Sequence, residues 1–151
     1  MALSTTQSIW RSGGGDQTRT AYCGSGVMAA QFYIADASVA TATNVAVSSA
    51  AGAPALILPA GAVVLGVYIN DAGSGSVDIG TRNYGTGSVT GAAIANNLSV
   101  ASTGAVTTGL TLTATAALSY VTVTIDTSGS GTVGGYITYF VVDPLAGQQN
   151  D

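Results

Sequence analysis

The chain contains no lysine, glutamate or histidine, and this absence limits its possible folds more than any other feature. Its 151 residues carry only three basic and seven acidic side chains, all of them Arg and Asp. Strong helix formers are therefore scarce, whereas Ala, Gly, Ser, Thr and Val are abundant, and β-branched residues favour strands. Disordered chains are poor in apolar residues, but 47% of this chain is hydrophobic. The composition predicts a single folded all-β domain.

The same composition excludes several classes of function. Without histidine or lysine the chain has no Ser-His or Ser-Lys nucleophile and no Schiff base. A paired-Asp glycosidase needs one acid in an apolar pocket, and only Asp36, after Ile34 and Ala35, has such neighbours in the sequence. The net charge of −4 removes the main attraction for nucleic acid. We expect a protein that is not an enzyme, has no cofactor or metal, and binds no nucleic acid.

The surface of such a chain needs an explanation. Soluble monomers carry about 25–35% charged residues on their surface, whereas only 7% of this chain is charged. Either Ser, Thr, Asn and Gly cover it, or neighbouring molecules do; we expect the second, because exposed apolar area marks interaction sites. The single Cys23 allows no internal disulfide, and no signal-peptide pattern follows Met1, so we expect synthesis in a reducing cytoplasm.

The first 26 residues differ from the remainder. They contain the only Trp, two of the three Arg and a triple glycine at 13–15. No strand or helix period persists there, which predicts an extended, glycine-hinged arm over 1–26 and a β-sandwich domain over 27–151. Trp is costly to leave in water. The candidate partner contacts in this arm are Ile9, Trp10, Arg11 and Arg19.

The alternation of apolar and polar residues predicts a series of short strands in the domain. The segment 84–108 is weakly patterned and is read as a long loop or as one short helix near 92–98. Residues 50–69 lack charge, but Gly and Pro interrupt them, so no membrane span is expected. Seven strands are predicted at 27–37, 41–47, 55–58, 62–70, 107–115, 118–125 and 133–142. A further strand that returns near Val77 brings the total to about eight antiparallel strands, which is typical of a sandwich or jelly roll.

One pattern occurs twice. Residues 67–77 align without gaps on residues 123–133, at an offset of 56, and both contain Gly-Ser-Gly after a strand-like run. We interpret each as a β-hairpin whose turn needs positive φ, produced by duplication or by convergence. The G-x-G-x-x-A/G matches at Gly24 and Gly129 are read as turns, since neither lies between a buried strand and a helix. Asp71, Asp78 and Asp126 are read as turn formers rather than calcium ligands.

Tyrosines are the remaining candidates for recognition. They could form a stacking platform for sugars or bases, although tyrosines in sheets usually pack at half-buried positions with the hydroxyl in water. We expect most of them to be structural. The candidates are Tyr68, Tyr84, Tyr120, Tyr136 and Tyr139.

In style, the chain resembles the small capsid decoration (cement or head-stabilising) proteins of tailed bacteriophages, or a related phage virion structural protein. The resemblance is carried by the arm through Gly26, the segment 58–70 and the closing hairpin over 120–142. It implies a β-rich homo-oligomer, with a trimer favoured, made in the host bacterial cytoplasm. Such a protein would bind the major capsid protein on the outer surface of the virion and stabilise the shell, without catalytic residues. The alternatives are a tail, fibre or head-fibre domain that binds host-surface glycan, and a pilin-like or sheath subunit.

Overall fold

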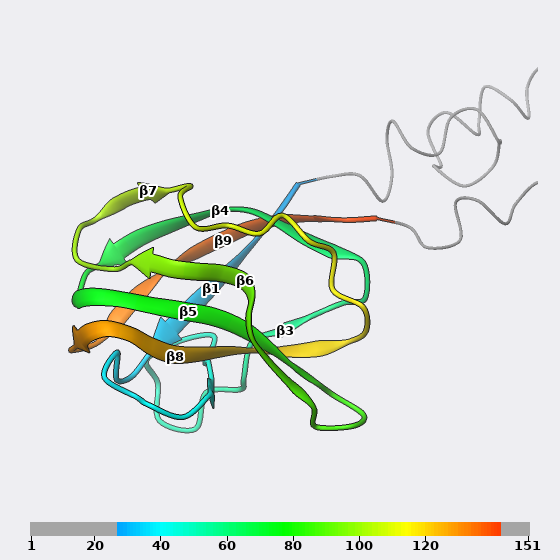
Figure 1. Ribbon diagram of the computed structural model, residues 1–151, viewed down its shortest axis with the longest axis horizontal. Helices are drawn as coiled ribbons and strands as arrows, with labels where there is room; N and C mark the ends of the chain where they lie inside the picture. Colours follow the sequence, from blue (N-terminus) through cyan, green and yellow to red (C-terminus); the bar gives the residue numbers. More distant parts are fainter. Residues whose placement is uncertain (1–26, 143–151) are drawn as a thin grey trace, which may run out of the picture.

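Two antiparallel sheets packed face to face form the body of the protein (Figure 1). The computed structural model describes residues 27–142, and within them every regular element is a strand, which confirms the all-β prediction. Sheet A has the order β1-β9-β4-β7, and sheet B has the order β2-β8-β5-β6 with β3 also paired to β8. The strands are β1 (Met28–Ile34), β2 (Thr43–Asn44), β3 (Ile57–Leu58), β4 (Ala62–Asp71), β5 (Ser74–Asn83), β6 (Val89–Ser99), β7 (Gly104–Val106), β8 (Ser119–Ser130) and β9 (Val133–Val141).

Strands β2 and β3 act as one interrupted strand. Both pair antiparallel with β8, at consecutive positions along one edge. Between them, Val45 N–H donates to Val121 O (2.9 Å) and Val121 N–H donates to Leu56 O (2.9 Å). These two strands are much shorter than the predicted 41–47 and 55–58, because the chain between them leaves the sheet. Counted as one position, they leave eight positions in jelly-roll order, which confirms the predicted class of a sandwich or jelly roll. The individual strands differ, because the prediction counted 41–47 and 55–58 separately and did not contain β6 or β7.

The two Gly-Ser-Gly segments lie at the turns between strands, with Ser74 and Gly75 already in β5 and Gly129 and Ser130 still in β8, but they do not form hairpins. Gly75 and Gly131 have φ of 77° and 83°, so the predicted backbone conformation is confirmed. However, β4 and β5 belong to opposite sheets, and so do β8 and β9. Each turn therefore carries the chain across the core, and the pairs that form are β4 with β9 and β5 with β8. The hairpin prediction was wrong, because alternation around a tight turn is the same whether the flanking strands bond to each other or face each other.

The hairpin within sheet B lies where the sequence was weakly patterned. Strand β6 pairs with β5, so both the long loop and the helix near 92–98 were wrong. Asn83 sets the turn: its Oδ1 accepts the N–H of Gly85 and of Thr86, both at 2.9 Å, and Gly87 has φ of 73°. Asn and Gly in this arrangement are turn signals. The small residues of β6 do not show a clear apolar alternation, which is why the strand was missed.

The strand predicted at 107–115 is also absent. This segment instead runs along the edge of β6, where Asn96 N–H donates to Gly109 O and Thr111 N–H donates to Ile94 O, both at 2.9 Å. Further on, Thr115 N–H donates to Ala62 O (2.9 Å). The segment connects β7 in sheet A with β8 in sheet B, so it cannot stay paired to one neighbour. It covers an edge that would otherwise be open.

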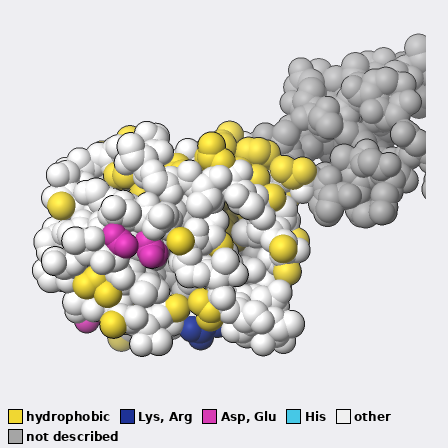
Figure 2. All heavy atoms as spheres, in the orientation of Figure 1, with side chains coloured by type: hydrophobic (Ala, Val, Ile, Leu, Met, Phe, Trp, Pro, Cys, Tyr) yellow, Lys and Arg dark blue, Asp and Glu magenta, His cyan; other side chains and the backbone are white. Residues whose placement is uncertain are grey.

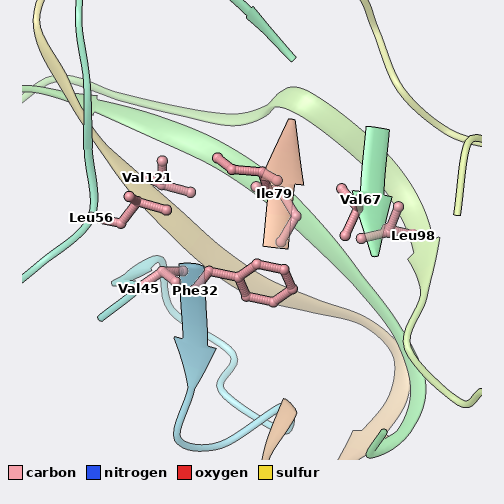
Figure 3. A pocket seen from close by; sticks show the side chains of 8 residues that line it. Phe32, Val45, Leu56, Val67, Ile79, Leu98 and Val121 are labelled. Atoms are coloured by element: carbon pink, nitrogen blue, oxygen red, sulfur yellow. The ribbon is translucent and has the colours of Figure 1, made fainter. Parts of the chain in front are cut away.

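Aliphatic side chains fill the space between the sheets. Ile34, Leu58, Ile69 and Leu98 are among the largest fully buried side chains. A cavity of about 10 Å³ remains in this core (Figure 3). It is at the lower limit for one water, and a water needs polar partners, so it stays dry. Its lining residues are Phe32, Val45, Leu56, Val67, Ile79, Leu98, Val121 and Ile137.

Candidate interaction surfaces

The partner contacts predicted from the sequence, Ile9, Trp10, Arg11 and Arg19, lie outside the described residues, as does the whole predicted arm at 1–26. The described surface belongs to residues 27–142, whose first strand begins at Met28.

Charge is sparse on this body, and the charged groups do not converge. Among the described residues, no three His, Cys, Asp or Glu side chains lie close enough to hold a metal ion. The face in Figure 2 is mainly white, which marks uncharged polar side chains and backbone. Hydrophobic groups gather at its upper right and lie in small groups elsewhere, with acidic groups near the centre and a basic group at the lower edge. The charged residues of this part are Arg82, Asp36, Asp71, Asp78 and Asp126.

Asp36 is a turn former. Its Oδ1 accepts hydrogen bonds from Ser38 Oγ (2.5 Å) and from Ser38 N–H (2.8 Å). These two bonds, the hydroxyl first, lower the pKa of the Asp36 carboxyl below its ordinary value, because they stabilise the charged form. The acid is exposed, so it does not have the apolar pocket that a glycosidase acid requires.

The other acids lie in strands rather than in turns, contrary to the sequence interpretation. Asp71 is the last residue of β4, Asp78 lies in β5 and Asp126 lies in β8. Asp78 Oδ1 accepts a hydrogen bond from the backbone N–H of Asn97 at 2.9 Å. This bond holds strand β6 to β5 at Asn97, whose φ is 54°. Asp126 Oδ2 accepts a hydrogen bond from Ser76 Oγ at 3.2 Å. The contacts of Asp78 and Asp126 therefore link neighbouring strands.

The outer face of sheet A, here called the A face, carries exposed tyrosines and no charged side chain within the sheet except Asp71 at the end of β4. Tyr68 and Tyr136 are cross-strand partners at its centre, 50% and 42% exposed. Their outer neighbours in the same row are Ala105 on β7 and Gln31 on β1. Both tyrosines alternate with core residues, so their rings point away from the core.

Sheet B carries a second aromatic pair. The rings of Tyr84 and Tyr120 lie 5.2 Å apart between centroids, with an interplanar angle of 32°. Tyr120 pairs with Ile57 on one side and with Arg82 on the other. Tyr84 is the first residue of the turn between β5 and β6, so this Tyr84–Tyr120 pair lies at the turn end of the hairpin, beside the only cation of the described body.

The five candidate tyrosines therefore do not form one platform. Tyr68 and Tyr136 are on sheet A, whereas Tyr120 is on sheet B and Tyr84 lies beside it in the turn after β5. Tyr139 packs against the core. Nothing in the sequence indicated this division, because it depends on which sheet each strand joins.

A shallow cleft of about 320 Å³ lies between β6 and the segment 111–116. Its walls are threonine and alanine side chains, with no ionisable group. Thr111 Oγ1 is already engaged, donating to Ala93 O at 2.7 Å. The cleft offers hydroxyls and methyls but no group that could act as an acid or base.

The body is thus a jelly-roll sandwich with two separate aromatic surfaces. No protein-family model matches the chain, and no curated protein matches it. A chain of the "Cyanophage Pam1 capsid asymmetric unit" is similar in structure, with a TM-score of 0.44 and 20% sequence identity over 78% of this chain and 86% of that chain. Over residues 27–142 there is no helix of the length and apolarity needed to cross a membrane.

Proposed function

We propose that this protein is a non-enzymatic structural protein of a bacteriophage virion, which binds the outer surface of the capsid as a homo-oligomer and stabilises it. The observation that carries the proposal is the charge-poor body. The described part has one Arg and four Asp, and these charges do not assemble into a site. A rigid sandwich surfaced by Ser, Thr, Gly and Ala has little side-chain entropy to lose when it docks, and many copies can approach without strong repulsion.

The proposed partners are the major capsid protein and further copies of this chain, with a trimer favoured. The arm at 1–26 would add contact through Ile9 and Trp10 and charge through Arg11 and Arg19. A tethered second contact raises the apparent affinity without any change in the body. Synthesis in the host bacterial cytoplasm, before attachment to the shell, is part of the same proposal.

The direct test mixes purified full-length protein with mature shells from which outer proteins have been stripped. Co-sedimentation should show saturable binding, and cryo-electron microscopy should place the sandwich on the outer surface at symmetric positions. Bound shells should withstand heating better than bare ones. Failure to bind matured shells, with the fold intact by circular dichroism, would contradict the proposal.

The arm is tested separately. Deleting residues 1–15 should leave the circular dichroism spectrum of the body unchanged and weaken shell binding. A matched variant, Trp10→Ala with Arg11→Ala, keeps the chain length and should weaken binding in the same direction. Unchanged binding by both variants would remove the arm from the interface.

A second function, a fibre or tail domain that binds host-surface glycan, is favoured by one observation. The Tyr84–Tyr120 pair presents two neighbouring rings next to Arg82, and sugars stack on such surfaces through C–H groups. A glycan array decides between the two functions: a decoration protein gives no hits, whereas a glycan-binding domain gives hits that Tyr84→Ala abolishes.

A further inference from the structure

We propose that copies of this chain associate through the A face, so that the outer faces of sheet A from neighbouring protomers pack against one another. The inference rests on the proposed function only in that a homo-oligomer is expected. The proposed function leaves open which surface joins the copies, and the A face is the surface proposed here.

Charge is distributed unevenly between the two sheets. Sheet B carries three of the five charged residues of the described body, Asp78 and Arg82 on β5 and Asp126 on the adjacent β8. The described body has a net charge of −3, from one Arg and four Asp. Two copies that met through sheet B would have to remove these charges from water, and the cores of interfaces are depleted of charged residues. The A face carries a single charged residue, Asp71 at the end of β4, and its central row of side chains is uncharged.

The A face carries side chains of the kind that form interfaces. Tyrosine supplies a large contact area with few rotatable bonds and keeps a hydroxyl for hydrogen bonding, and it is enriched in interfaces. Tyr68 and Tyr136 lie side by side near the middle of the sheet, where contact hot spots form. Polar amides on the same face, Gln31 and Asn70, are both exposed and can satisfy hydrogen bonds at the rim. Neither tyrosine is needed for the core, since Val67, Ile69 and Ile137 already fill it.

The sheet edges of the described body are poor alternatives for contact between copies. The edge of β6 is covered by residues 109–111, and β7 has three residues. The edge of β1 is closed at Tyr33, whose N–H donates to Ala46 O at 2.8 Å. Edge-to-edge pairing would therefore be short, whereas the A face extends across four strands. Packing of this face around a symmetry axis is compatible with a trimer as well as with a dimer.

The test uses full-length protein and light scattering coupled to gel filtration. Tyr136→Asp should convert the wild-type oligomer to a monomer at the same concentration, with an unchanged circular dichroism spectrum. Tyr84→Asp is the matched control, because Tyr84 is 54% exposed and lies beside Tyr120 of the other sheet. Dissociation by Tyr84→Asp but not by Tyr136→Asp would overturn the proposal, and so would a monomeric wild-type protein.

A mixing experiment separates self-packing from a loss of folding. Tyr136→Asp and Tyr136→Arg should each be monomeric alone and should associate when mixed, because opposite charges then face each other. Absence of mixed oligomers would show that the A face does not pack on itself. Shell binding is measured on the same samples: a monomeric Tyr136→Asp that still binds shells weakly supports both proposals, whereas an oligomeric wild type that ignores shells removes only the proposed function.

Discussion

Ser74 and Ser130 join the two Gly-Ser-Gly turns, because their Oγ atoms lie 2.6 Å apart and form a hydrogen bond. The two serines are equivalent positions in the repeated sequence pattern, 56 residues apart. They are also register partners at the ends of β5 and β8. The repeated sequence pattern thus corresponds to a contact in space. The β4–β5 connection and the β8–β9 connection, which each pass from one sheet to the other, lie next to each other.

Removing the hydrogen bond between Ser74 and Ser130 should cost little stability. Removing the second serine should add almost nothing to the loss caused by removing the first. Ser74→Ala and Ser130→Ala should each lower the free energy of unfolding by about 0.5–1.5 kcal/mol, towards the lower limit because water can reach the remaining hydroxyl. The double variant should lose hardly more than either single variant. Urea midpoints of the four proteins give the coupling, and additive losses would contradict a shared bond.

The glycines that follow these serines should differ in tolerance, although both have positive φ. A Cβ at Gly131 would meet nothing nearer than Gly73 Cα at 3.7 Å, whereas a Cβ at Gly75 would lie 2.3 Å from Thr127 O. Gly131→Ala should therefore cost about the 1–2 kcal/mol of a left-handed conformation. Gly75→Ala should cost clearly more, and thermal unfolding of the pair measures the difference. Equal losses would indicate that the backbone relaxes at Gly75.

One added methylene in the core cavity should be tolerated. Val67→Ile extends a side chain that lines the cavity of about 10 Å³. A gain of at most about 0.8 kcal/mol is expected, the value of one buried CH₂. Val133→Ile is the control, since Val133 is fully buried and does not line the cavity, so overpacking should cost about 1–3 kcal/mol. Denaturant midpoints should move in opposite directions.

Thr122 should be replaceable by valine with a gain in stability. Its side chain is fully buried on the outer side of sheet B, and its Oγ1 has no hydrogen-bond partner. The side chain of Arg82 accounts for the burial of Thr122. Arg82 lies on β5 and its Nη2 donates to Ala42 O at 2.8 Å, so its side chain passes over β8 near Thr122. Thr122→Val keeps the shape and removes an unpaired hydroxyl, worth about 1–3 kcal/mol. Thr124→Val, at a half-exposed position of the same strand, is the control; a loss at Thr122 would instead indicate that the hydroxyl is bound.

Asp36 should make a small pH-dependent contribution to stability. Because the Ser38 hydrogen bonds lower its pKa in the folded protein, this contribution is present above the ordinary value of 3.8 and is lost as the pH falls through the lower folded value. In Asp36→Asn this titration is absent. The difference in unfolding free energy between the two proteins should therefore shrink as the pH falls through 3.8 and below it. A difference that stays constant with pH would contradict the assignment.

The sequence by itself determined the class of the fold and much of its local structure. The lack of Glu and Lys and the alternation over 62–70, 118–125 and 133–142 predicted strands that the structure contains as β4, β8 and β9. The glycines of the repeated pattern predicted left-handed turns, which Gly75 and Gly131 adopt. These features are local: side-chain alternation and backbone dihedral preferences depend on neighbouring residues.

Only the tertiary structure decided which strands pair and which residues share a surface. Backbone hydrogen bonds are the same for every residue, so a turn such as 73–75 cannot encode whether the next strand joins the same sheet or the opposite one. That choice follows from the packing of Val67, Ile79 and Val121 across one core. It placed Tyr68 beside Tyr136 and separated both from Tyr84, and so created the A face. Residues distant in sequence share this surface because two sheets must cover each other's apolar sides.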